Sequence, residues 1–133
     1  MSRGSSVQAL IESTLSQLEY ELESEGAEYD FIPAAIPAYR WSVYTNDRDS
    51  AQDPWRLHRR ISARNMDRGK LRSFEADCLH RLAPSAGPMA TQIAIQRCKW
   101  DGQQYVAEAC RTLELRPGGG ISTCTHPRPP ADC

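Results

Sequence analysis

The feature that most constrains the fold is a run of alternating apolar and polar residues from Thr91 to Leu115. This run is interrupted at Trp100-Asp101-Gly102, which we expect to form a three-residue loop with Gly102 in the left-handed conformation. The pattern therefore predicts an antiparallel β-hairpin. The expected cross-strand pairs are Lys99 with Gln103, Arg97 with Tyr105, Ile95 with Ala107 and Ile93 with Ala109.

One face of this hairpin is expected to be buried and the other to be wet, because side chains alternate between the two faces of a strand. The expected apolar face holds Ile93, Ile95, Tyr105, Ala107, Ala109, Leu113 and Leu115. The expected wet face holds Gln92, Gln96, Cys98, Gln104, Glu108, Cys110, Thr112 and Glu114. A lone hairpin is marginal in water, so another element must cover the apolar face.

Two amphipathic helices are available as that cover. The first runs from about Ser5 to Glu25, where apolar residues recur every three or four positions: Val7, Ile11, Leu15, Leu18 and Leu22. The second runs from Lys70 to Leu82, with an apolar stripe at Leu71, Phe74, Cys78 and Leu82. Glutamates crowd the end of the first helix, where the helix dipole favours cations, so they are either solvated or met by basic groups elsewhere.

Two further strands are expected between the helices. Residues 39–45 alternate, with Tyr39, Trp41 and Val43 on one side. Residues 55–63 are ambiguous, because Asp53-Pro54 suits a helix start while the residues after it alternate. We interpret 55–63 as a strand that pairs with 39–45.

Residues 117–133 differ in composition from the rest of the chain, with three consecutive glycines, prolines and few large apolar side chains. We expect a flexible Gly/Pro-rich tail with polyproline II character near its prolines, following one domain at residues 1–116. The predicted fold is therefore α+β: two helices packed on an antiparallel sheet of about four strands, in the order α-β-β-α-β-β, with a disordered C-terminal tail.

The N-terminus lacks the apolar core of a secretory signal, and no stretch of the sequence is long and apolar enough to span a bilayer. Five cysteines without a CxxC motif fit free thiols in a reducing compartment better than a disulfide framework. We therefore expect a cytoplasmic protein that does not associate with membranes.

No cofactor, metal site or catalytic residue is predicted. Cys78-Leu79-His80 and Cys124-Thr125-His126 are two Cys-x-His pairs, but their spacing is unlike that of usual zinc sites. No nucleophile or phosphate-binding motif is present. The segment from Pro127 to Pro130 has the spacing of a proline-rich ligand, a match that short segments often make by chance.

The most pointed feature is a basic tract at residues 56–72, where seven of seventeen residues are arginine or lysine. Residues 1–55 hold ten acidic and three basic side chains, whereas residues 56–133 hold seven acidic and thirteen basic ones. The tract could meet an acidic protein, bind phosphates of a nucleic acid, or balance the acidic end of the first helix. The candidate partner-binding residues are Arg56, Arg59, Arg60, Arg64, Arg68, Arg72 and Trp55.

These features predict a small non-catalytic protein-binding module that acts as an accessory, adaptor or inhibitor subunit. One alternative is nucleic-acid binding through the Arg56–Arg72 tract. Another is an enzyme or ligand pocket on a curved sheet, lined by Trp41, Trp55 and Tyr105 and recognisable by convergent polar side chains. The sequence does not identify the partner or the oligomeric state.

Overall fold

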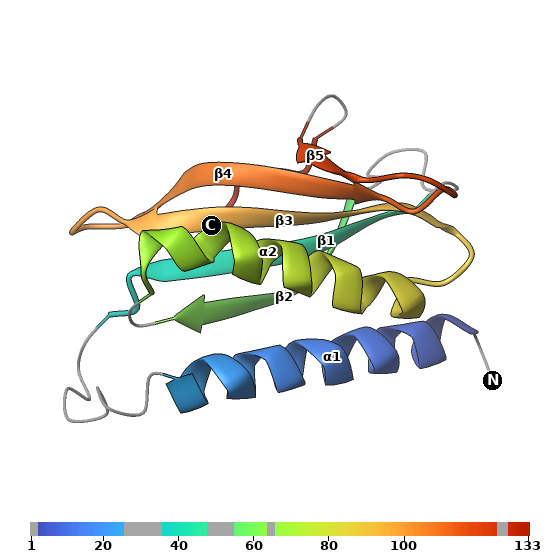
Figure 1. The fold of residues 1–133 in the computed structure, drawn as a ribbon, viewed down its shortest axis with the longest axis horizontal. Helices are drawn as coiled ribbons and strands as arrows, with labels where there is room; N and C mark the ends of the chain where they lie inside the picture. The colour runs from blue at the N-terminus through green and yellow to red at the C-terminus, as the bar shows by residue number, and fades with distance from the viewer. Residues whose placement is uncertain (1–2, 26–35, 48–54, 64–65, 125–127) are drawn as a thin grey trace.

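The computed structural model describes residues 3–25, 36–47, 55–63, 66–124 and 128–133, and Figure 1 shows their arrangement. Their elements, in chain order, are α1 (Arg3–Glu25), β1 (Tyr39–Asp47), β2 (Trp55–Ala63), α2 (Arg68–Leu82), the short 3-10 helix η2 (Ala83–Ser85), β3 (Ala90–Trp100), β4 (Tyr105–Glu114) and β5 (Ile121–Thr123). The predicted α+β class is confirmed, as is a strand at residues 55–63. The sheet has five strands, rather than about four.

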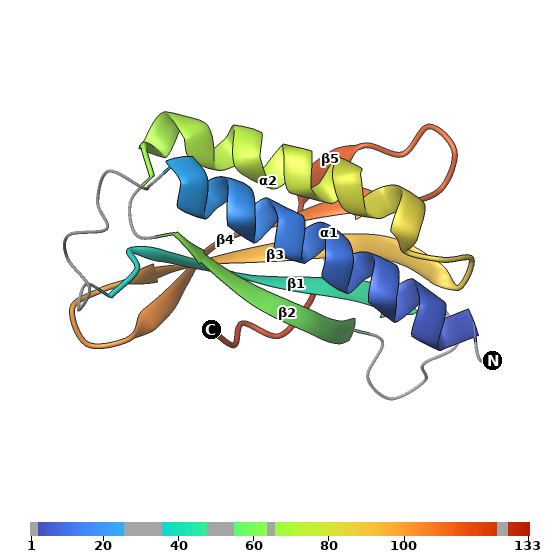
Figure 2. The same ribbon diagram turned by 90° about the horizontal axis from the view of Figure 1, so that it is seen from below.

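All strand pairs are antiparallel, and the order across the sheet is β2-β1-β3-β4-β5. Both helices lie on the same face of this sheet (Figures 1 and 2). We call this the helix face and the opposite one the back face. The core under the helices joins Trp41 and Val43 of β1 to Ile93 and Ile95 of β3.

The two helices cover the sheet with stripes close to those predicted. In α1, Ile11, Leu15, Leu18 and Leu22 are buried. In α2, the buried side chains are Leu71, Glu75, Cys78, Leu79 and Leu82. Phe74 is half-buried at the edge of this stripe, and a carboxylate, Glu75, takes a central place beneath the helix.

The β3–β4 hairpin is present, but its predicted register is wrong. Trp100 pairs with Tyr105, so the connection spans four residues, 101–104, instead of three. A bulge between Arg97 and Cys98 then shifts the register by one more residue, and Ile93 pairs with Leu113. The Asp101 carboxylate sets the longer loop by accepting hydrogen bonds from the backbone N–H groups of residues 103 and 104, which lower the pKa of Asp101.

The back face is also covered, which the wet-face prediction did not anticipate. Gln96 is only 2% exposed, and Thr112 and Cys110 are buried. A second apolar cluster lies on this face and holds Tyr44, Trp55, Ala94, Cys110 and Cys124. The C-terminal residues lie on the same side of the sheet, opposite the helices (Figure 2).

Residues 117–133, expected to be a flexible tail, contain ordered elements where the structure describes them. Gly118 has φ +77°, and the Gly119 N–H donates to the carbonyl of Arg116, so the chain turns back to form β5. Strand β5 pairs with β4 at residues 111–113.

Four of the five cysteines form disulfides, against the expectation of free thiols. Cys110 is bonded to Cys124, and Cys98 is bonded to Cys133. Both bridges tie the C-terminal segment to the hairpin from the back face. Cys78 is a free, buried thiol in α2. The physical reason for the difference is proximity in space, because β5 brings Cys124 beside β4. The prediction of a flexible tail did not include this strand, so it placed no partner near Cys110.

Among the described residues, no helix is long and apolar enough to cross a membrane.

Candidate docking groove between the two helices

The basic tract does not form one patch in the described part of the structure. Arg56 and Arg60 are exposed on the edge strand β2, whereas Arg68 and Arg72 are exposed on α2. Arg64 lies outside the described residues. The tract was predicted as a unit because its residues are close in sequence, but a strand and a helix that follow one another display them on different surfaces.

Several tract residues have internal roles. Arg59 donates to the Glu19 carboxylate of α1 at 3.2 Å and to the Ser16 hydroxyl at 2.6 Å. Arg68 donates to Glu108 of β4 at 3.3 Å. Trp55 is buried in the back-face cluster, so it is not a surface anchor.

The acidic end of α1 is therefore partly met by basic side chains of the fold. Arg59 pairs with Glu19, as described, and Arg81 of α2 pairs with Glu21 at 2.8 Å. This agrees with the interpretation that basic groups elsewhere balance these glutamates. Arg56, Arg60 and Arg72 have no hydrogen-bond or ion-pair partner among the residues that the structure describes.

The pocket lined by Trp41, Trp55 and Tyr105 is not formed. Trp41 is buried in the core on the helix face, whereas Trp55 belongs to the back-face cluster. The Tyr105 ring packs under the guanidinium of Arg40 at 4.1 Å, and its hydroxyl donates to the carbonyl of Pro37 at 2.7 Å. Because the two tryptophans lie on opposite faces of the sheet, the three side chains cannot line one cavity.

A buried ion network under α2 is the strongest electrostatic feature of the described chain. The Glu75 carboxylate, 1% exposed, accepts from the Trp41 indole at 2.8 Å, from Arg97 at 2.9 Å and from Arg111 at 3.0 Å. Arg97 also donates to Glu108 at 2.8 Å. Every contact of Glu75 comes from the fold itself, so we assign this network to the docking of α2 on the sheet.

This network could have been found in the sequence. Arg97 and Arg111 alternate in phase with the apolar residues Ile93, Ile95 and Leu113, so they are expected on the helix face. Glu75 is four residues after Leu71 and lies on the apolar stripe of α2. Two arginines and one glutamate on surfaces predicted to meet indicate a buried ion pair.

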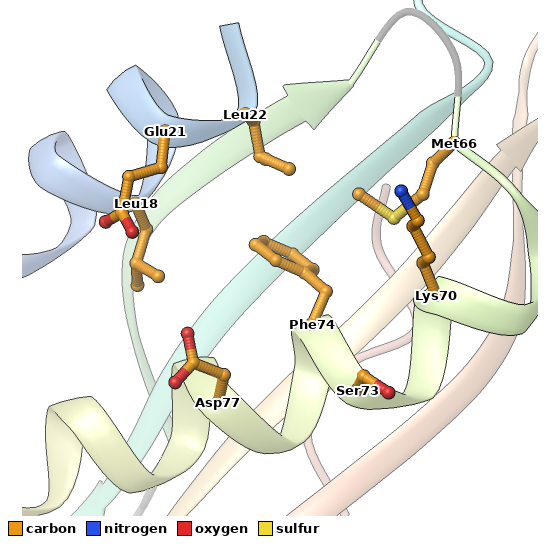
Figure 3. Close-up of a pocket in the computed structure, with 8 residues that line it drawn as sticks. All are labelled: Leu18, Glu21, Leu22, Met66, Lys70, Ser73, Phe74 and Asp77. Carbon is orange, nitrogen blue, oxygen red and sulfur yellow. The ribbon is translucent and has the colours of Figure 1, made fainter. Parts of the chain in front are cut away.

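A groove opens between the second half of α1 and the first half of α2, with a volume of about 260 Å³. Its lining residues are Leu18, Glu21, Leu22, Met66, Lys70, Ser73, Phe74 and Asp77 (Figure 3). The Phe74 ring points into the middle of it and rests on buried Trp41, with 4.7 Å between ring centroids. The floor is therefore apolar and supported by the core.

The two ends of this groove carry opposite charges. Glu21 of α1 and Asp77 of α2 face each other across one end, and both accept hydrogen bonds from Arg81. Lys70 stands beside Met66 at the other end (Figure 3). An apolar floor between a carboxylate pair and an ammonium can hold an apolar side chain and also orient the chain that carries it.

Another hollow of about 770 Å³ lies between residues 83–91 and residues 114–117. Prolines, a glycine, small residues and Leu115 supply most of its lining, with Glu114 and Arg116 as its charged members. We take the groove between the helices as the candidate site because an aromatic ring and long aliphatic side chains form its floor.

The described cysteines and acidic side chains offer no metal-binding cluster of three or more ligands. Cys124, a member of one of the two Cys-x-His pairs, is in a disulfide, and His126 lies outside the described residues. Burial raises the pKa of the Cys78 thiol to about 12, so it stays protonated at neutral pH and is a poor nucleophile.

No protein-family model, curated protein or solved structure matches the chain.

Proposed function

We propose that the protein binds another protein through the groove between α1 and α2 and serves as an accessory, adaptor or inhibitor subunit. The observation that carries this proposal is the groove itself: an apolar floor of Leu18, Leu22, Met66 and Phe74 with charges of opposite sign at its ends. Recognition by an apolar anchor in a pocket with a polar rim is the usual arrangement of protein interfaces.

The partner segment is expected to present one apolar side chain to Phe74, a basic residue towards Glu21 and Asp77, and an acidic residue towards Lys70. Such a charge pattern selects one orientation of the segment along the groove, because the reversed orientation sets like charges against each other.

The tract residues of β2 offer a second contact in this proposal. Arg56 and Arg60 are exposed on an edge strand, where they can meet acidic groups of the same partner. Nucleic-acid binding through these arginines is distinguished from protein binding by nuclease treatment, which removes a bound nucleic acid and leaves a bound protein.

The cytoplasmic location expected from the sequence remains a prediction, and the two disulfides weigh against it. Disulfides persist mainly in oxidising compartments, because cytosolic reductants keep most thiols reduced.

The groove is tested by placing a photo-crosslinking amino acid at Ser73, which is exposed and lines it. The matched control carries the same group at Ser122, an exposed serine of β5. We expect protein adducts at position 73 only, identified by mass spectrometry with and without nuclease.

The binding energy is then tested with the purified partner. Lys70→Glu should slow association several-fold at low salt, because charges on the rim act mainly on the association rate. Lys70→Glu combined with Asp77→Lys exchanges the charges at the two ends of the groove. This double variant should not restore binding of the partner in its native orientation. Adducts confined to position 122, or partner affinity indifferent to all groove variants, would refute the proposal.

A further inference from the structure

The back face of the sheet holds a segment of the chain's own C-terminal region, residues 128–133. Within this segment Pro129 is buried, and the carbonyl of Pro130 accepts a hydrogen bond from the Tyr44 hydroxyl at 3.4 Å. The carbonyl of Cys133 accepts from Arg40, and the Cys98–Cys133 disulfide joins the segment to β3. The segment therefore lies across β1 and is fastened at one end.

The back face around this segment is rich in hydrogen-bond donors. Three buried polar atoms have no partner within the described residues: Arg40 Nε, Ser42 Oγ and Trp55 Nε1. The arginine and indole nitrogens can only donate, and the serine hydroxyl can donate as well. Ser42 lies between Arg40 and Tyr44 on the same face of β1, and both neighbours already donate to carbonyls of the segment.

A surface of donors selects a ligand that offers acceptors and few donors of its own. Proline has a carbonyl but no N–H, and consecutive prolines hold the chain in an extended helix whose carbonyls point outwards. Aromatic side chains beside such donors are the usual floor for proline-rich ligands. Tyr44 is such an aromatic here, because its hydroxyl donates to the Pro130 carbonyl, and Trp55 belongs to the same back-face cluster.

We propose that the back face at β1 is a docking surface for a proline-rich extended segment of another protein, and that residues 128–133 occupy it as an internal ligand. This surface lies on the opposite side of the sheet from the groove between α1 and α2. The inference is therefore independent of the function proposed for that groove.

The Cys98–Cys133 disulfide controls access in this proposal. A dithiol reductant transfers two electrons and two protons to the bridge, which becomes two thiols, while the reductant becomes a cyclic disulfide. The internal ligand is then held only by its non-covalent contacts. The segment remains covalently attached to the chain that follows β5, and β5 pairs with β4, so the segment stays at a high effective concentration and competes with a partner.

The test uses the full chain with Pro129→Ala, Pro130→Ala and Cys133→Ser, which weakens the internal ligand and keeps the Cys110–Cys124 bridge. The probe is the synthetic peptide acetyl-Arg-Pro-Pro-Ala-Asp-Ser-amide, and the control peptide has alanine at both prolines. Binding is followed by the amide NMR shifts of residues 40–46 and 94–98. If the triple variant does not fold, Cys133→Ser alone is used with the same criteria.

We expect the proline peptide to bind the variant in a saturable way and at least tenfold more tightly than it binds the oxidised wild-type protein. The alanine peptide should bind at least tenfold more weakly, and Tyr44→Phe in the variant should weaken the proline peptide about fivefold through the loss of one hydrogen bond. No saturable shift at millimolar peptide, or equal affinity for the two peptides, would overturn the proposal.

Discussion

Glu75 places a single carboxylate in the middle of an otherwise apolar helix stripe. There it accepts hydrogen bonds from three side chains on three different strands. The Trp41 indole comes from β1, Arg97 from β3 and Arg111 from β4. A charge buried this deeply is tolerated only when its hydrogen bonds are made, because burying an unpaired charge is strongly unfavourable. Glu75 therefore fixes where α2 sits over the sheet.

Glu75→Gln should lower the free energy of unfolding by about 3 kcal/mol, because Arg111 loses its carboxylate partner and Arg97 keeps only Glu108 among the described residues. Asp77→Asn on the same helix is the control: Asp77 is exposed and, among the described residues, pairs with Arg81 alone, so the loss should be under about 1 kcal/mol. Urea unfolding of both variants measures the difference. Equal midpoints would show that the network contributes no more than a surface pair.

At the scale of elements, local patterns predicted the helices and strands well. The apolar stripe from Ile11 to Leu22 follows the period of a helix, and residues 39–45 and 55–63 follow the period of a strand. Each period can be recognised from residues that are close in sequence. The β3–β4 register was missed because the hairpin loop lies at residues 101–104 instead of 100–102, and because a bulge then adds a residue on one strand without any marked sequence signal. The alternation of apolar and polar residues is regular on either side of the bulge, so Ile93 and Ile95 were still correctly assigned to the buried face.

The covered back face could not be predicted from the hairpin alone. A strand that alternates apolar and polar residues normally has one wet face, and Gln96, Cys98 and Cys110 suit that interpretation. Their burial depends on residues from β5 onwards, which reach the sheet through a Gly-rich turn and two disulfides. The candidate groove was missed for a similar reason, since its residues belong to two helices whose pairing no local pattern reveals.

Because both faces of β3 are buried, adjacent substitutions there should both destabilise the protein. Ile95→Asp puts an unpaired charge into the core and should cost several kcal/mol, enough to unfold a domain of this size. Gln96→Asp should cost about 2 kcal/mol for the same reason on the back face.

Lys99→Asp provides the control for this pair, because Lys99 is exposed near the end of the same strand and its replacement should change stability by less than about 0.5 kcal/mol. Thermal unfolding followed by circular dichroism measures all three. A Gln96→Asp variant as stable as Lys99→Asp would mean that the back face is open to water.

For the whole molecule, the two disulfides join the sheet to its C-terminal segment over sequence separations of 35 and 14 residues. In the chain-entropy account, closing loops of these lengths restricts the unfolded chain by about 4 and 3 kcal/mol, respectively. The two loops are nested, so their effects overlap and the sum is an upper bound. Even one of them is a large fraction of the stability of a small domain.

Reduction should therefore lower the midpoint of urea unfolding by an amount that corresponds to about 3 kcal/mol or more. The measurement compares oxidised and dithiothreitol-treated protein at one pH. A Cys78→Ala variant, which keeps both disulfides, is the control and should show the same difference between the two states. An unchanged midpoint after complete reduction, verified by thiol counting, would contradict this expectation.

The nesting of the bridges also implies an order of assembly. The inner pair, Cys110 and Cys124, is short-range and is brought together by the turn that leads from β4 into β5, so it can close as soon as that turn forms. The outer pair needs Cys133, which is the last of the five cysteines to be synthesised. Its partner Cys98 is synthesised much earlier, in the first strand of the hairpin. A non-native disulfide between Cys98 and Cys110 can form early, because both cysteines are synthesised before either of their native partners. In an oxidising environment, correct folding therefore requires the inner disulfide to form before the outer one. The Cys98–Cys133 bond, which holds residues 128–133 on the sheet, forms last.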